Sequence, residues 1–301
     1  MKRFLLQIAV FMAIVAIVDV SIGKIFSYLE RNAKGGYTYR DRYICDLLET
    51  DILVSGSSRC VRHYNPQILT DSLGGACYNS GQMGNGIILS YGRLRMINER
   101  RKPKVIVYDL HPSFDLLIGE DNHRYLTWLK SHYDRDGIAE IFESIDKTEK
   151  YKMQSKMYRY NSRWVELTMD YLHKSTDAGN NGFGPLKGEM DPKKIKEVSK
   201  KESIKRYDFD PVKVEYINRM INESAGSKLI FVVSPIWYGM DSLKFQPVKE
   251  LCKSKGIPFY DFSNSPKYVH QDIYFKDGVH MNAKGADEFS RDIVEIFRKE
   301  I

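Results

Sequence analysis

Five short apolar runs alternate with stretches of helical spacing, and this alternation constrains the fold more than any other feature of the sequence. The apolar runs cover residues 51–55, 74–78, 104–110, 228–234 and 257–262. The clearest helical stretches cover residues 87–101, 245–255 and 283–298. Strands that alternate with helices are joined by crossover connections, which place parallel strands side by side and helices on both faces. The sequence therefore predicts an α/β fold, a three-layer α/β/α sandwich with about five parallel strands.

A chain of 301 residues is long enough for one large core and an anchor. We expect residues 1–24 to form an N-terminal membrane anchor or signal, residues 25–50 a stem, and residues 51–301 the folded domain. The segment at about 113–227 is too long for one crossover, so we expect it to form a helical insertion over the site.

The N-terminus begins with a targeting pattern. Residues 4–23 are mostly apolar, with Asp19 as the only charge, and a helix of this length can cross a bilayer core. Lys2 and Arg3 precede the run and are expected to stay in the cytoplasm, which places the rest of the chain on the extracytoplasmic (periplasmic) side. No small-x-small cleavage site follows the run, so we favour an uncleaved transmembrane helix; secretion after signal cleavage is the alternative.

The net charge of +7 comes from scattered basic residues, and no nucleic-acid-binding motif accompanies them. We therefore expect no nucleic-acid partner, while a weak attraction to anionic lipid headgroups stays open. The four cysteines lack both a CxxC pair and a metal-ligand spacing with histidine, so neither a metal site nor any other cofactor is expected. Free buried thiols are favoured; a Cys60–Cys77 disulfide is the alternative in an oxidising compartment.

Polar residues follow the predicted strands, and the functional crevice of an open parallel sheet lies beyond these carboxyl ends of the strands. Ser58 follows the first run where the chain turns into a helix, so its hydroxyl and backbone N–H are expected to face the crevice. An N-capping serine is the alternative. In the same crevice, Asn79 and Gln82 line the site or form turns, and Arg59 binds an anionic substrate group or pairs on the surface.

Asp277 and His280 form the second candidate group. Three positions apart, they fall on the same side of a helical turn, where the carboxylate can hold the tautomer of the imidazole. The imidazole can then take a proton from Ser58. A helix-capping aspartate with an exposed histidine is the alternative interpretation of this pair.

Three blocks together resemble the SGNH/GDSL hydrolase superfamily: Gly-x-Ser at residues 56–58, Asn-x-Gly-x-x-Gly at 79–84, and DGVHMNAKG at 277–285. The similarity covers about residues 51–110 and 229–298 and implies a flavodoxin-like SGNH fold. It also implies that Ser58 is the nucleophile, with Ser57 where the family usually has aspartate, and that Asp277 and His280 complete a triad. The N–H groups of Ser58 and Gly84 are then implied as oxyanion donors.

The third block departs from the family pattern. Where Gly-x-Asn-Asp is expected, residues 109–112 read Asp-Leu-His-Pro, so the usual asparagine donor is missing. Loss of one oxyanion donor costs about 3 kcal/mol of transition-state stabilisation, unless His111 or a group from the insertion replaces it. The departure resembles divergent branches of polysaccharide O-acetyltransferase and D-alanine transfer type.

The sequence thus predicts a serine-dependent ester hydrolase or O-acyltransferase that acts on acylated cell-envelope glycans through a Ser-His-Asp triad. Its partners are expected to be an acylated carbohydrate or another small ester and, through the N-terminal helix, the membrane. The alternative is a non-catalytic envelope or glycan-binding protein on a degenerate SGNH scaffold. The sequence fixes neither the acyl donor and acceptor nor the oligomeric state.

Overall fold

The computed structural model describes residues 1–173, 180–191 and 207–300, so the predicted insertion at about 113–227 lies partly outside the described residues. The chain divides into two compact units. Unit 1 comprises Met1–Leu47 and Leu126–Asp177, and unit 2 comprises Leu48–Tyr125 and Ala178–Ile301.

Unit 2 contains a five-stranded sheet in the order β2-β1-β3-β4-β5, in which all pairings are parallel. The strands are β1 (Ile52–Gly56), β2 (Cys77–Asn79), β3 (Val105–Asp109), β4 (Lys228–Val233) and β5 (Phe259–Asp261). In the register of the sheet, Ile52 pairs with both Cys77 and Val105. The prediction of about five parallel strands in an α/β fold is confirmed, and the strand order is the flavodoxin-like one.

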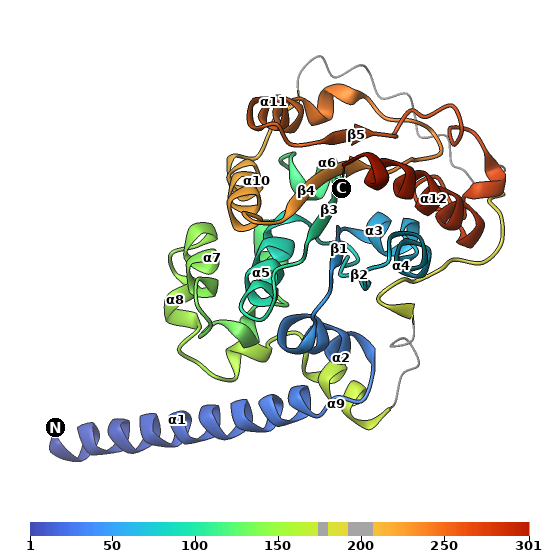
Figure 1. Ribbon diagram of the computed structural model, residues 1–301. Coiled ribbons are helices and arrows are strands. Elements are labelled where there is room, and N and C mark those ends of the chain that lie inside the picture. Colours follow the sequence, from blue (N-terminus) through green and yellow to red (C-terminus); the bar gives the residue numbers. More distant parts are fainter. Residues whose placement is uncertain (174–179, 192–206, 301) are drawn as a thin grey trace. The chain divides into compact units, whose positions relative to one another are not determined.

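Helices cover both faces of the sheet, which explains why β1 and β3 are buried along their whole length. One group packs together on one face: α3 (Ser58–His63), α4 (Pro66–Leu73) and α12 (Ala283–Glu300) (Figure 1). The other face carries α5 (Ile87–Asn98), α6 (Pro112–Asp115) and α10 (Pro211–Glu223). The remaining elements are α11 (Gln246–Lys255) and the short 3-10 helices η2 (Asn122–Leu126), η7 (Ser242–Phe245) and η8 (Asp272–Tyr274).

An asparagine side chain and a glycine cap the two ends of α4, the helix that precedes β2. Asn65 precedes Pro66, the first residue of α4, and its Oδ1 accepts a hydrogen bond from the backbone N–H of Gln67 at 3.1 Å. At the other end Gly74 takes the left-handed conformation with φ 73°, which ends the helix. The strand β2 begins three residues later, at Cys77.

Aromatic side chains fill the core between the sheet and α12. The fully buried ring of Phe289 has its centroid 5.3 Å from those of Tyr64 and Phe262 and 5.8 Å from that of Tyr268. Burial of such large apolar surfaces is the main stabilising contribution of this layer.

The four cysteines are buried thiols that form no disulfide, as the sequence favoured: Cys45, Cys60, Cys77 and Cys252. No disulfide joins Cys60 to Cys77.

Unit 1 contains the N-terminal helix α1 (Lys2–Arg31), whose first seventeen residues are exposed. By length and composition α1 is a candidate membrane anchor or signal segment. The other helices of this unit are α2 (Gly36–Arg42), the π-helix η1 (Tyr43–Leu47), η3 (Lys130–His132), α7 (Ile138–Ile145), α8 (Glu149–Lys152), η4 (Tyr158–Tyr160) and α9 (Trp164–Leu172).

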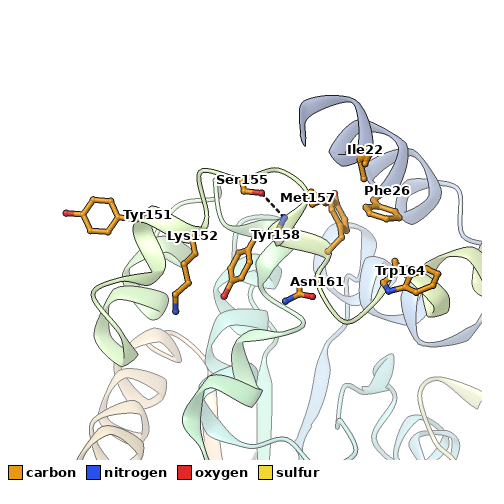
Figure 2. A pocket seen from close by; sticks show the side chains of 10 residues that line it. Ile22, Phe26, Tyr151, Lys152, Ser155, Met157, Tyr158, Asn161 and Trp164 are labelled. Atoms are coloured by element: carbon orange, nitrogen blue, oxygen red, sulfur yellow. Dashed lines mark hydrogen bonds between the residues drawn. The ribbon is translucent and has the colours of Figure 1, made fainter. Parts of the chain in front are cut away.

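Asp19, the charged residue within the apolar run of α1, accepts hydrogen bonds from the loop that follows α8. The carboxylate of Asp19 accepts hydrogen bonds from the hydroxyl of Ser155 and from the backbone N–H groups of Lys156 at 2.8 Å and Met157 at 3.0 Å. Beside this contact, Ile22 and Phe26 of α1 face a cavity of about 670 Å³ (Figure 2). The rest of its wall is formed by Tyr151, Lys152, Ser155, Met157, Tyr158, Tyr160, Asn161 and Trp164.

Candidate active site

Ser58 is the first residue of α3 and lies directly beyond the end of β1. The turn between strand and helix depends on Gly56, whose φ of 148° is unfavourable for other residues. A Cβ at this position would also lie 2.6 Å from the carbonyl oxygen of Asp109. Ser58 is buried, with 8% of its surface exposed.

The structure brings Ser58, His280 and Asp277 together within unit 2. Nε2 of His280 lies 2.9 Å from Oγ of Ser58, and Nδ1 lies 3.0 and 3.1 Å from the two carboxylate oxygens of Asp277. A carboxylate can only accept, so Nδ1 carries the proton in the neutral ring and Nε2 accepts from the Ser58 hydroxyl. This is the geometry of a nucleophile, a general base and an orienting carboxylate.

The segment that joins Asp277 to His280 is a bend, whereas the spacing argument used a helical turn. Oδ1 of Asp277 accepts backbone hydrogen bonds from Val279 and His280, both at 2.8 Å. The carboxylate therefore shapes its own loop and brings the imidazole back onto itself. The side chains meet as expected, but the local backbone that brings them together is a different one.

Hydrogen bonding lowers the pKa of Asp277 to about 2. Partial burial opposes this change, but the hydrogen bonds from the His280 side chain and from the N–H of Val279 outweigh it. The carboxylate is therefore ionised at neutral pH.

A second, buried chain of hydrogen bonds supports the backbone next to His280. The N–H of Met281 donates to Nε2 of His63 at 3.0 Å, so the proton of this ring lies on Nδ1. Nδ1 donates to Oγ of Ser234 at 3.0 Å, and this hydroxyl donates to Oδ2 of Asp109 at 2.9 Å. The pKa of His63 lies well below its usual value because burial and the nearby Arg59 disfavour the imidazolium.

Sequence reasoning gave no role to the members of this chain. Asp109 and Ser234 were recognisable as residues that end or follow strands, but His63 lies within a short helix and carries no pattern of its own. Only the packing of α3 against α12 and the sheet brings the three together.

Arg59 is fully buried, and its guanidinium donates to the carbonyl oxygens of Leu110 and, at 3.5 Å, of Ser234. The same positive charge lies near Asp109, whose pKa burial raises and Arg59 lowers in part. These contacts connect α3 with the ends of β3 and β4.

Asn79 and Gln82 are also buried and make contacts within the protein. Oδ1 of Asn79 accepts from the N–H of Gly81 at 3.1 Å, the geometry of an Asx turn, and its Nδ2 donates to the Cys60 carbonyl at 2.7 Å. Gln82 accepts from Arg93 at 3.1 Å.

Gly84 and His111 are the two remaining candidates. Gly84 has a φ of 64°, a conformation that favours glycine, and a Cβ there would come within 2.9 Å of Nη2 of Arg124. The imidazole of His111 stacks on Phe114 with centroids 4.3 Å apart, and its buried Nδ1 makes no hydrogen bond to any described residue. Burial lowers the pKa of His111 well below its usual value, and repulsion from Arg59 and His280 adds to this effect.

Tyr238, which the sequence analysis did not name, places an aromatic ring beside the loop that carries Asp277 and His280. Cε1 of its ring would lie 3.1 Å from a Cβ at Gly278, which lies between Asp277 and His280 in the chain. Its side chain is partly exposed and lies near enough to Asp277 for the carboxylate to raise its pKa, after the larger effect of burial.

Comparison with known proteins gives only distant similarities. No family model and no curated protein matches the sequence. One similar structure, from Bacteroides fragilis and provisionally described as an acylhydrolase, has 12% identity and a TM-score of 0.43, covering 88% of this chain and 96% of the other. A protein from Streptococcus pneumoniae, provisionally described as a platelet activating factor, has 13% identity and a TM-score of 0.42, covering 95% and 98%. At these values the similarity carries no information on activity.

Proposed function

We propose that this protein is a membrane-anchored, serine-dependent ester hydrolase or O-acyltransferase of the SGNH type, which acts on acylated glycans of the cell envelope. The observation that supports this most strongly is the 2.9 Å contact between Ser58 and an imidazole that Asp277 orients from its other side. A binding protein has no use for a hydroxyl, a base and a carboxylate in this order, so the geometry favours catalysis over the non-catalytic alternative.

The reaction proceeds by double displacement. Oγ of Ser58 attacks the ester carbonyl carbon while its proton passes to Nε2 of His280, and the collapse of the tetrahedral intermediate returns that proton to the leaving alcohol. Water or a sugar hydroxyl then gives a proton to Nε2 and attacks the acyl-enzyme, and Oγ recovers the proton as the acyl group leaves. Water yields a carboxylic acid, whereas a sugar hydroxyl yields a new ester.

The oxyanion of each intermediate needs hydrogen-bond donors. We assign this role to the backbone N–H groups of Ser58 and Gly84 and to the ring of His111. Burial keeps His111 neutral, and its Nδ1 lacks a hydrogen bond to any residue that the structure describes. A buried polar atom without a partner is uncommon, and a donor for a charge that appears only during the reaction accounts for it.

The anchor is expected to be retained. The Asp19 carboxylate holds the loop at Lys156 and Met157, so cleavage after α1 would leave two backbone N–H groups of unit 1 without their acceptor. With Lys2 and Arg3 in the cytoplasm, the site acts outside the membrane. Tethering there raises the effective concentration near envelope glycans.

Labelling of the full-length protein in detergent with a fluorophosphonate probe tests this proposal. Wild type should be labelled and should release acetate from a chromogenic ester, and Ser58→Ala should do neither. Ser57→Ala is the matched control, because the neighbouring Oγ is buried and makes no hydrogen bond to a described residue. A folded wild type that is neither labelled nor hydrolytic would support the non-catalytic glycan-binding protein.

A further inference from the structure

A second cluster of reactive side chains lies in unit 1, in the part of the chain that the catalytic proposal does not use. Asp41 lies in the last turn of α2, Cys45 lies four residues later in the π-helix η1, and His132 is the last residue of η3. One ligand atom from each of the three lies within 4.8 Å of the other two. All three residues are buried, at 2%, 0% and 8% exposure.

The separations in this cluster are wider than those of strong hydrogen bonds. Nε2 of His132 lies 3.6 Å from Oδ2 of Asp41, beyond the range of about 2.7–3.2 Å for N–H···O bonds. Sγ of Cys45 donates a long, weak hydrogen bond to Oδ1 of Asp41 at 3.8 Å. Ligand atoms at about 2.0–2.3 Å from a tetrahedral metal ion are roughly 3.3–3.7 Å apart, which is close to these values.

His132 provides an independent indication. Its Nε2 is buried, points into the cluster and makes no hydrogen bond to any residue within the described ranges. A buried imidazole nitrogen that makes no hydrogen bond and lies beside a carboxylate and a thiol is an available ligand atom.

The surroundings of His132 favour its charged form. Burial lowers the pKa of His132, but interactions with Cys45 and Asp41 outweigh this effect, so that the pKa is raised well above its usual value.

We propose that Asp41, Cys45 and His132 bind a zinc ion that ties α2 and η1 to η3. Thiolate, imidazole and carboxylate are the common zinc ligands, and water would complete a tetrahedral set. Binding of one Zn²⁺ releases one proton from the Cys45 thiol and one from the His132 imidazolium, so the total charge of the cluster is unchanged. The wide sequence separation between Cys45 and His132 explains why ligand spacing did not indicate the site.

Metal analysis of the full-length protein, purified in detergent without chelator, tests this proposal. Wild type should carry one zinc per chain, and Cys45→Ser and His132→Gln should lose it. Cys252→Ser is the matched control, because Cys252 is also a free buried thiol but lies in α11 of unit 2. This control should retain the metal.

A second measurement avoids the question of whether the variants fold. Wild type stripped with a chelator should unfold at a lower temperature, recover on addition of zinc, and with Co²⁺ show a thiolate-to-metal charge-transfer band. A folded, stripped wild type that gains neither stability with zinc nor a thiolate band with cobalt would overturn the site and leave a hydrogen-bonded polar cluster. Hydrolysis of the chromogenic ester reports separately on the catalytic proposal.

Discussion

Replacement of Asp277 by asparagine changes the charge of the triad while it keeps the shape of the loop. Asparagine retains one oxygen, which can still accept from the N–H groups of Val279 and His280, now at 2.8 Å. Its NH₂ group then faces Nδ1 of His280, which must accept instead of donate. The ring proton moves to Nε2 and faces Oγ of Ser58, so the imidazole can no longer take the proton of the nucleophile.

The expected cost to catalysis is large and the cost to folding is small. A wrong imidazole tautomer in a serine triad lowers kcat by on the order of 10⁴, which corresponds to about 5.4 kcal/mol in the activation free energy. The side chain of Asp277 is 53% exposed, so its pairing with His280 contributes at most about 1 kcal/mol to the free energy of unfolding.

The assay is kcat for the chromogenic acetate ester, with Ser58→Ala as the background, and chemical denaturation of the same samples. Asp277→Asn with kcat within tenfold of wild type would refute the assignment of the orienting carboxylate.

The stability of wild type should also depend on pH through Asp277, whose pKa is about 2, below its usual value of 3.8. Its contribution to stability is therefore present above pH 3.8 and lost only as the pH falls through about 2.

Further predictions concern the buried chain, the core and the anchor. His63 is neutral in the folded protein, whereas in the unfolded chain it binds a proton below its usual pKa of 6.5. The free energy of unfolding should therefore fall as the pH drops from 7 to 5. In urea titrations, His63→Gln should reduce that fall by up to about 2 kcal/mol. Phe289→Ala should lower the free energy of unfolding by about 3–5 kcal/mol, against less than about 0.5 kcal/mol for the exposed Leu243→Ala. Because α1 is expected to cross the bilayer, we expect the cavity lined by Ile22 and Phe26 near its end to lie close to the bilayer surface. With Trp128 and Trp237 replaced by phenylalanine, brominated lipids should then quench the fluorescence of Trp164, which lines this cavity and is 59% exposed, and an unquenched Trp164 would contradict that position.

The sheet was predictable from the sequence because buried parallel strands are continuous apolar runs. The predicted run 104–110 contains β3 (Val105–Asp109), and the run 228–234 contains β4. The second strand was placed too early, at residues 74–78, because Gly74 still belongs to the end of α4 and only Cys77–Asn79 pair with β1. A helix cap and a short edge strand overlap there, and apolar content alone cannot separate them.

The pairing of Ser58 with His280 was predictable for a topological reason: both follow strands that end at the same edge of the sheet. The backbone that joins Asp277 to His280 was not, because an aspartate that accepts the next backbone N–H groups forms a bend where spacing alone suggests a helical turn. The burial of Arg59 could not be predicted either, because its partners are carbonyl oxygens that follow two strands distant in the sequence.

The loop that carries His280 is held from two sides by different groups. On its exposed side the ionised Asp277 holds the ring of His280, and on its buried side a hydrogen-bonded chain from Asp109 through Ser234 and His63 holds the N–H of Met281. Both supports come from groups of the protein itself, so the imidazole is held in place before any substrate binds. If the proposed function holds, substitution of Tyr238, whose exposed ring lies beside Gly278, should change the preference between water and a sugar hydroxyl as acceptor more than it changes the position of His280.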